Sequence, residues 1–463
     1  MTDLTLAISA IDHRFLEAHL FPGDGFEAAA ILICGRAGET GERLCVRSVI
    51  AIPYDACSVR TPIRLNWPGA YLERAIDEAD AISGTIILVH SHPGGCFDFS
   101  TIDDDSDRVA ISCLRQGSDD ETIAHGSAIM IPSGHMKARI YAEDETPRAI
   151  GKIWRIGSTI NDVSSPNTRP VLPFSSEMTL QFNRISACVV GASGTGSPTI
   201  EMLTRMGFGK IVQVDFDKME LANLNRILNS SLSDAQLGTP KVEVLERAAK
   251  LHRPGVNIVS VLLAISEEAA IIAASGCDII FCCVDTMEGR LYCDLIAEAC
   301  LIPIIDMGVM IPTRESCDRV DIADVLARID YVYPGGATLR NRGEITGEGL
   351  AAEAMRQTDP QTYAQQLKEG YIRGVAEEAP SVIALNMHAA SLAVMEAVAR
   401  FFPFRHEPND LHDRIFSSLA ARETDYELSD PPPDREANSI YGQGLKYPLL
   451  GIVVQPAKTQ NTA

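Results

Sequence analysis

The sequence lacks the paired cysteines of a disulfide-rich protein. Its 12 cysteines form no C-x-x-C pair, and none follows Cys317. Most of them lie in apolar runs such as SACVV and IIFCCV, where a thiol behaves as a small hydrophobic side chain. Disulfides are therefore not expected to hold the fold together, and we expect a reducing, cytoplasmic location.

Positive charge and long apolar runs are also scarce. The chain has 40 Lys and Arg against 62 Asp and Glu, and both residues 1–160 and the remainder contribute to its net charge of −22. Nucleic acids and anionic membranes attract basic surfaces, so we expect neither as a partner. No apolar run approaches the roughly 18 residues that span a membrane, and the start of the chain has no basic-then-apolar signal.

The sequence does contain enough apolar residues for large cores. With 463 residues, 46% of them hydrophobic, about two to four domains are expected. Residues 1–157 combine strand-like apolar runs with helix-like segments, which predicts a mixed α/β domain. Residues 158–180 are rich in Ser, Pro, Thr and Asn, a composition typical of a linker. Strands and helices then alternate, so residues 181–463 are predicted to form an α/β domain with a doubly wound, Rossmann-like sheet.

Two histidines follow one another at the end of the apolar run GTIILVH, residues 84–90. His90 and His92 are two residues apart on an extended segment, so both imidazoles face one side and can reach one ion. A nearby carboxylate could supply a third ligand. Three protein ligands leave one tetrahedral position for water, which is the arrangement of a catalytic zinc site.

The complete string is H-x-H-x7-S-x2-D, with His90, His92, Ser100 and Asp103 at its fixed positions. It resembles the motif of the JAMM (Mov34-type) zinc metalloproteases. The resemblance implies zinc on His90, His92 and Asp103, and a hydrogen bond from Ser100 to a tetrahedral oxyanion. It also implies a glutamate general base at the head of an early strand, for which Glu27 is the best match.

Other residues near this motif could also bind metal. Cys96 is an alternative ligand because it lies in the loop between the second histidine and the serine. A helix N-terminal acidic cluster is the interpretation we favour for Asp98, Asp104, Asp105 and Asp107.

A glycine-rich turn marks the second predicted site. Gly191, Gly194 and Gly196 follow a strand-like run and precede a helix-like one. Backbone amides at such a helix start can bind phosphate, so the turn alone fits NAD, FAD or ATP. Asp215, at the end of the next strand, supplies the acidic residue that recognition of a ribose requires.

The residues after this turn favour adenylation over hydride transfer. Adenylation needs basic groups to steady the triphosphate and the transition state, and a carboxylate to hold magnesium. The chain offers these groups in the order DFD, NLNR, GTPK and VDT, which contain Asp215, Asn223, Arg226, Lys241 and Asp285. The ordered set resembles that of the ThiF/ubiquitin-activating adenylyltransferase family, strongly over about residues 180–310 and more weakly over 380–402.

The resemblance implies a role for each of these residues. Asp215 would bind the ribose hydroxyls of ATP, and Asp285 would bind magnesium. The phosphates would be contacted by Asn223, Arg226 and Lys241, of which the two basic residues also act in catalysis. Asp217 is expected to order the loop, with direct nucleotide contact as the alternative. Family members usually dimerise through this domain, so the resemblance also implies a homodimer.

The chain departs from this family where thiols are expected. Many members carry the activated protein as a thioester on a cysteine, and many hold a structural zinc with two C-x-x-C pairs. Thr338 and Asn341 stand where the thiols of the first pair would be. Cys317 and Thr338 are thus weak candidates for a covalent site, and we favour direct transfer of the adenylate to a conjugating enzyme.

Together the two motif sets predict a bifunctional enzyme. A zinc (iso)peptidase and an adenylating domain would both act on the C-terminal tail of a ubiquitin-like carrier protein. This combination resembles bacterial ubiquitin-like modification systems, which implies a conjugating enzyme as partner and a role in antiphage defence. The alternative is processing and activation of a sulfur-carrier protein for cofactor or sulfur amino-acid biosynthesis. A non-catalytic assembly protein is disfavoured because both motif sets are complete.

Overall fold

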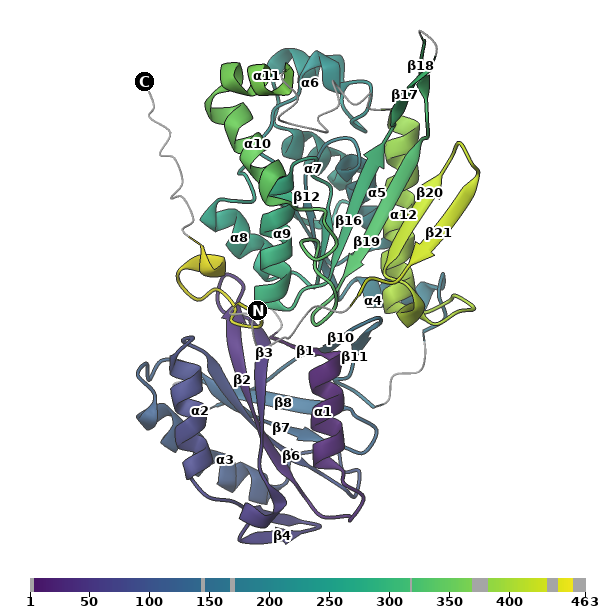
Figure 1. The fold of residues 1–463 in the computed structure, drawn as a ribbon. Helices are drawn as coiled ribbons and strands as arrows, with labels where there is room; N and C mark the ends of the chain where they lie inside the picture. Colours follow the sequence, from purple (N-terminus) through teal and green to yellow (C-terminus); the bar gives the residue numbers. More distant parts are fainter. Residues whose placement is uncertain are drawn as a thin grey trace. The chain divides into compact units, whose positions relative to one another are not determined.

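The computed structural model of the protein describes residues 4–142, 146–166, 171–316, 319–368, 382–430 and 440–452. The chain divides into two units. Unit 1 combines residues 1–170 with 298–302 and 434–453, and unit 2 combines residues 171–297, 303–433 and 454–463. Each unit contains one large sheet (Figure 1).

Unit 1 is built on a nine-stranded mixed sheet in the order β11-β10-β1-β3-β2-β6-β7-β8-β9. Its strands are β1 (Thr5–Ser9), β2 (Ala29–Ala37), β3 (Arg43–Ala51), β6 (Thr85–Ser91), β7 (His125–Met130), β8 (Met136–Tyr141), β9 (Pro147–Ala149), β10 (Lys152–Ile156) and β11 (Ile160–Asp162). Its helices are α1 (Ala10–Leu20), α2 (Ala70–Asp80) and α3 (Thr101–Gly117), and a small hairpin is formed by β4 (Val59–Thr61) and β5 (Arg64–Asn66). The mixed α/β class predicted for this part of the chain is confirmed.

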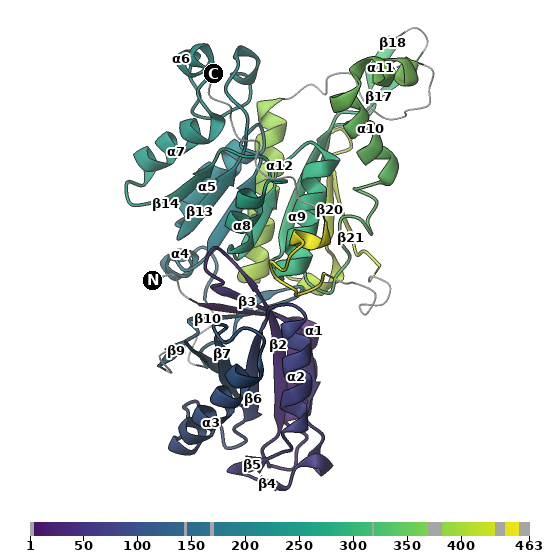
Figure 2. The same ribbon diagram turned by 90° about the vertical axis from the view of Figure 1, so that its left-hand side faces the viewer.

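The centre of this sheet is covered on both faces, which explains why β2 is almost uniformly apolar. Along β2, Leu32 packs with Leu16 and Leu20 of α1 in one core cluster. Its neighbours Ile31 and Ile33 belong to a second cluster that includes residues of α2 and α3. Successive side chains of a strand point to opposite faces, so α1 covers one face and the other two helices cover the other (Figures 1 and 2).

Two distant stretches of chain complete unit 1. Arg43 is fully buried, and its guanidinium donates to the carbonyl oxygens of Cys300 at 2.9 Å and Leu301 at 2.8 Å. Arg47 donates to the Tyr441 carbonyl oxygen at 2.7 Å, and a bridge joins Arg36 to Gly444. Residues 440–452 therefore add backbone to the β2–β3 region, a role that the sequence did not indicate.

Part of the segment predicted as a linker, 158–180, has regular structure. β11 pairs antiparallel with β10 through the Trp154–Asp162 to Ile156–Ile160 register. Helix α4 (Ser176–Phe182) starts at the N-cap Ser175, whose side chain accepts the Met178 N–H. Serine and asparagine are typical of loops, but they also begin helices and close turns, so composition alone did not separate these possibilities.

Unit 2 is built on an eight-stranded sheet in the order β14-β13-β12-β15-β16-β19-β20-β21. Its strands are β12 (Ser186–Val190), β13 (Lys210–Val214), β14 (Asn257–Val261), β15 (Ile279–Cys282), β16 (Ile304–Met310), β19 (Leu326–Val332), β20 (Arg414–Ser418) and β21 (Glu423–Glu427). The first five run parallel and the last three pair antiparallel. A separate hairpin is formed by β17 (Thr313–Ser316) and β18 (Arg319–Ile322).

The parallel strands have the order of a doubly wound sheet, which confirms the predicted Rossmann-like class. The remaining helices are α5 (Gly196–Met206), α6 (Leu232–Leu237), α7 (Lys241–His252), α8 (Glu268–Ser275), α9 (Met287–Cys300), α10 (Gly347–Thr358), α11 (Pro360–Lys368) and α12 (Ile383–Phe401). The chain order reverses between β12 and β15, so right-handed crossovers place α5 and α7 on one face and α9 on the other. Ligands of such sheets bind at this reversal, beyond the carboxyl ends of the strands. Among the described residues, no helix is long and apolar enough to cross a membrane.

Candidate metal and nucleotide sites

The first predicted site lies at the end of β6 in unit 1. His90 pairs with Ala29 of β2, and the Ser91 N–H donates to the Ala28 carbonyl oxygen at 3.0 Å. The buried Ser91 hydroxyl oxygen also accepts the Ala28 N–H at 2.9 Å. These bonds fix Glu27, the residue before Ala28, beside the strand end that carries both histidines.

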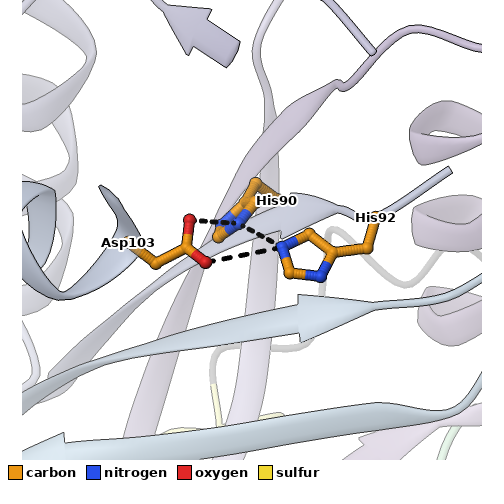
Figure 3. A group of neighbouring side chains, drawn as sticks. All are labelled: His90, His92 and Asp103. Atoms are coloured by element: carbon orange, nitrogen blue, oxygen red, sulfur yellow. Dashed lines mark hydrogen bonds and ion pairs between the residues drawn. The ribbon is translucent and has the colours of Figure 1, made fainter. Parts of the chain in front are cut away.

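The structure brings the three predicted zinc ligands together (Figure 3). The two Nε2 atoms of His90 and His92 are 3.1 Å apart. One Asp103 oxygen lies 3.1 Å from His90 Nε2, and the other lies 3.6 Å from His92 Nε2. Within the described ranges these three are the one group of His, Cys, Asp or Glu side chains whose ligand atoms all lie within 4.8 Å.

The orientation of these ligands suits a metal ion. His92 Nδ1 lies 2.8 Å from the Cys96 carbonyl oxygen, which can accept its proton and leave the Nε2 lone pair toward the cluster. Two imidazole nitrogens and a carboxylate oxygen are donors that zinc prefers. The donor set and its spacing therefore fit zinc.

Ser100 and Asp103 are positioned by the start of α3. Ser100 is the N-cap, and its hydroxyl oxygen accepts the Asp103 N–H at 3.2 Å. The Asp103 carboxylate in turn accepts the Ser100 N–H at 2.6 Å. This reciprocal pair is a capping box, which explains why the helix begins here and why its third residue points back toward the histidines.

Glu27 is buried next to this cluster, with 9% of its surface exposed. Its pKa is raised by burial, while the nearby His90 and His92 act in the opposite direction. Its backbone N–H donates to the Thr61 carbonyl oxygen at 2.9 Å, so the β4–β5 hairpin lies against it. The structure thus places all four motif residues and Glu27 in one site.

The alternative ligands lie outside the cluster. Cys96 is exposed, and it does not belong to the group formed by His90, His92 and Asp103. The acidic residues pair with basic ones instead: Asp98 with Lys137, Asp104 and Asp107 with Arg139, and Asp105 with Arg108.

The second predicted site lies beyond β12 in unit 2. Gly191 has a φ of +92°, and a Cβ there would lie 2.8 Å from the Cys283 carbonyl oxygen. A Cβ on Gly196 would collide with the Gly191 carbonyl oxygen. The turn between β12 and α5 therefore needs glycine at both positions, and it leads directly into the N-terminus of α5.

Asp215 is buried at the end of β13, and burial raises its pKa. One carboxylate oxygen accepts the Ala192 N–H at 2.7 Å, and the other accepts the Asp217 N–H at 2.8 Å. Each oxygen can accept a second bond, so a ribose hydroxyl can still donate to it. Asp215 thus ties the glycine-rich turn to the next strand.

Lys241 starts α7 and is buried, with 5% of its surface exposed. Its Nζ lies 2.6 Å from an oxygen of Asp217, whose side chain is about half exposed. Asp217 therefore holds the ammonium group in place.

The remaining predicted residues occupy the surrounding loops. Asn223 is buried, and its side-chain oxygen accepts the Glu220 N–H at 3.0 Å. Arg226 is half-exposed and donates to the Ala222 carbonyl oxygen at 2.9 Å, while its Cδ lies near Gly194. Asp285 is exposed just beyond β15, the strand next to β12.

Comparison with known sequences assigns this half of the protein. The sequence model of the ThiF family matches residues 167–417. The chain belongs to the ThiF family.

Curated proteins and solved structures are also similar to part of this ThiF-family protein. It is 31% identical over 172 residues to ubiquitin-like modifier-activating enzyme 5 of Drosophila grimshawi, covering 34% of this chain and 42% of that protein. It is 33% identical over 155 residues to the Aedes aegypti enzyme of the same name, covering 30% and 38%. The chain thus spans about two-fifths of the length of these curated relatives. A crystal structure of E. coli MccB with ATP is 16% identical, covers 57% of this chain and 68% of that one, and has a TM-score of 0.43.

Unit 2 contains a residue beside the glycine-rich turn that was not predicted from the sequence. Asn386 of α12 is buried, and its carboxamide fills the space that a Cβ on Gly194 would need, beside Arg226. The family resemblance is weaker over this helix, and no residue of it was predicted as part of the site. The signal was present, because Asn386 interrupts an apolar stripe that continues through Ala389, Ala390 and Ala393.

In unit 2, hydrogen bonds between Thr338 and Asn341 stand where the first C-x-x-C pair of the family would be. The Thr338 hydroxyl donates to the Asn341 side-chain oxygen at 2.8 Å, and the Asn341 N–H donates back to the Thr338 hydroxyl at 3.2 Å. The Thr338 N–H reaches the same Asn341 oxygen at 3.1 Å. Cys317, the other weak candidate for a covalent site, lies outside the described residues.

Proposed function

We propose that this chain processes and activates a ubiquitin-like carrier protein. Unit 1 acts as a zinc-dependent (iso)peptidase of the JAMM type, and unit 2 adenylates the tail of the same carrier. The observation that carries the proposal is the convergence of His90, His92 and Asp103 in a chain whose residues 167–417 match the ThiF family. Both reactions act on a C-terminal tail, so one substrate explains their fusion.

In unit 1, His90, His92 and Asp103 would hold zinc. A zinc ion bound there supplies Lewis acidity, which lowers the pKa of water and polarises the scissile carbonyl. Glu27 takes a proton from the attacking water and returns it to the leaving amine. The Ser100 hydroxyl accepts the Asp103 N–H, which leaves its own proton to stabilise the oxyanion.

The surroundings of this site support a polypeptide substrate. Phe26, Ile63 and Ile102 are exposed by 41%, 77% and 57%. Phe26 precedes the base, Ile102 precedes the ligand Asp103, and Ile63 lies at the turn of the hairpin that contacts Glu27. Exposed apolar side chains next to site residues can bind another protein.

In unit 2, the carrier's C-terminal carboxylate attacks the α-phosphorus of ATP, and pyrophosphate leaves. Lys241 and Arg226 stabilise the charge on the phosphates, and the turn at Gly191–Gly196 presents backbone N–H groups. Asp215 binds the ribose, and Asn223 contacts the phosphates. Asp285 would hold magnesium, which supplies charge neutralisation when bound.

The acyl adenylate then passes directly to a conjugating enzyme. No cysteine follows Cys317 in the sequence, and the Thr338 hydroxyl is committed to Asn341. This proposal places the protein in a bacterial ubiquitin-like modification system with a role in antiphage defence, acting as a homodimer through unit 2. If a sulfur carrier is the substrate instead, addition of a sulfur donor will convert the adenylate to a thiocarboxylate.

The full chain can be tested with a carrier that extends beyond its diglycine tail. We expect zinc-dependent cleavage of the extension, and pyrophosphate exchange into ATP only with the mature carrier. Glu27→Gln should abolish cleavage alone, and Asp285→Ala should abolish exchange alone. Absence of both reactions with several candidate carriers would contradict the proposal, as would loss of both in either variant.

A further inference from the structure

The side chain of Arg139, on β8, reaches from the sheet of unit 1 to the start of α3. Its side chain is 11% exposed, although arginine is usually exposed. It belongs to neither motif that the sequence revealed. A buried guanidinium requires several partners to replace its hydration, and the structure provides them.

The partners of Arg139 come from α3, from β7 and from the loop before α3. Its Nη2 donates to an Asp107 oxygen at 2.6 Å, and its Nη1 donates to an Asp104 oxygen at 2.7 Å. Its Nε reaches the same Asp107 oxygen at 3.1 Å and the Ser127 hydroxyl of β7 at 3.2 Å. Its Cζ lies 3.7 Å from the centre of the Phe99 ring.

Two of these partners flank the Ser100–Asp103 segment in the sequence. Phe99 immediately precedes Ser100, and Asp104 immediately follows Asp103. One guanidinium therefore holds both ends of the segment that carries a predicted metal ligand and a predicted oxyanion donor. Asp107, one turn further along α3, is buried and also accepts the Tyr141 hydroxyl at 2.8 Å. Through Asp107, Arg139 is therefore connected to buried residues of the sheet.

We propose that Arg139 is a positioning residue for this site: by holding Phe99 and Asp104, it fixes Ser100 and the Asp103 carboxylate against the two histidines. The inference rests on the proposed zinc site and adds a residue outside its motif. The fork of a guanidinium binds two carboxylates and stacks on a ring at once, which a lysine ammonium cannot do. Residues that orient metal ligands typically change metal affinity by about 10- to 100-fold.

The same strand offers a matched control. Lys137 lies two residues before Arg139, so both side chains leave the same face of β8. Lys137 also binds an aspartate of the α3 approach, Asp98, at 2.5 Å, but its side chain is 42% exposed and that of Asp98 is 82% exposed. Exposed ion pairs contribute little, so Lys137→Met removes a similar charge without loosening the site.

The test measures zinc affinity of the metal-free full chain by competition with a chromophoric chelator. Arg139→Met should raise the zinc Kd by about 10- to 100-fold, and Lys137→Met should leave it within about twofold. Arg139→Lys should recover only part of the loss. The visible spectrum of the Co²⁺-loaded protein should also change in Arg139→Met, because a displaced carboxylate alters the ligand field. On a cleavable carrier, kcat should fall while KM stays within about threefold.

A milder variant keeps the inference testable if Arg139→Met does not fold. Asp104→Asn removes one charged partner from an exposed position and should weaken zinc binding by a few fold, with α3 intact by circular dichroism. Parental zinc affinity and a parental Co²⁺ spectrum in folded Arg139→Met or in Asp104→Asn would overturn the positioning role. Failure of the unmutated chain to bind zinc would instead overturn the proposed protease site, and this inference with it.

Discussion

The two candidate sites differ in how their residues are distributed along the chain. The metal cluster takes its three ligands from residues 90–103, across one strand end and one helix start. The nucleotide site takes its residues from 191 to 386, and several are already engaged with one another, such as Lys241 with Asp217. A site local in sequence can be recognised from one motif, whereas a dispersed site depends on the fold of the whole sheet.

The strongest test of this contrast removes one ligand of the local site. His92→Ala deletes one of three metal donors, and two donors do not hold zinc at a catalytic site. We expect carrier cleavage to fall to background and bound zinc to disappear in elemental analysis. Pyrophosphate exchange should be unchanged, and its loss would show that the two sites are not independent.

Glu27 separates proton transfer from metal binding in the same site. Glu27→Gln keeps the shape of the side chain and removes the proton acceptor, so kcat for cleavage should fall by about 10²- to 10⁴-fold. Zinc content should stay at the parental level because Glu27 is not among the clustered ligands. Glu17→Gln, at a half-buried position of α1, is the control and should cleave normally.

Lys241 tests whether the dispersed site works as a unit. Lys241→Met removes a buried cation that Asp217 holds in place. Loss of one electrostatic stabiliser typically costs about 10²- to 10³-fold in rate, and we expect that loss in pyrophosphate exchange. Exposed Lys218, in the same loop, is the matched control, and Lys218→Met should keep the parental rate. An equal loss in both variants would indicate a general charge effect.

Acid should affect the two units in a different order, because they bury polar groups differently. In unit 1, burial lowers the pKa of His125 to about 4 from 6.5. Its Nδ1 accepts the Ile86 N–H at 3.2 Å, which requires the neutral ring, and Nε2 lies 3.3 Å from the Ser118 hydroxyl. In unit 2, Glu396 is ionised between Arg400 and Arg405, and the charge of Arg400 helps to lower its pKa although burial alone would raise it.

The unfolded chain therefore binds more protons than folded unit 1 between pH 6.5 and 4, so the free energy of unfolding falls as the pH falls through this window. From pH 7 to pH 5, His125 alone should cost unit 1 about 2 kcal/mol. The contribution of Glu396 is present above its unfolded pKa of about 4.5 and is lost only at lower pH. Hydrogen exchange, corrected for intrinsic rates, should show loss of protection in β7 at pH 5 while α12 stays protected. The reverse order would contradict this assignment.

The smallest expected effect concerns the turn at Thr338. Thr338→Ala removes the hydroxyl that bonds Asn341 and should lower the stability of unit 2 by about 1 kcal/mol, as seen in denaturant unfolding. Carrier adenylation should persist, because this proposal gives the hydroxyl no chemical role. Abolished carrier transfer with unchanged adenylation would instead indicate a nucleophile at this position.

The motif residues could be predicted from the sequence, but the residues that position them could not. His90, His92 and Asp103 lie together, as the family resemblance implied, because a strand end and a helix cap are local structures. Arg139 and Asn386 could not be identified in the same way, since their partners are distant in sequence and meet them only through tertiary packing. The alternation of strands and helices predicted the doubly wound sheet. Composition missed β11 and α4 because their polar residues also suit a linker.

Unit 1 is formed from three separate stretches of the chain, which limits how the two activities can be separated by truncation. Residues 298–302 and 434–453 belong with the N-terminal stretch, so a cut at any single position before them leaves unit 1 without part of its backbone. Unit 2 is likewise interrupted at 298–302. Point substitutions, rather than shortened fragments, are therefore the way to assign each activity to its unit, and a nonsense mutation late in the gene would damage the first unit as well as the second.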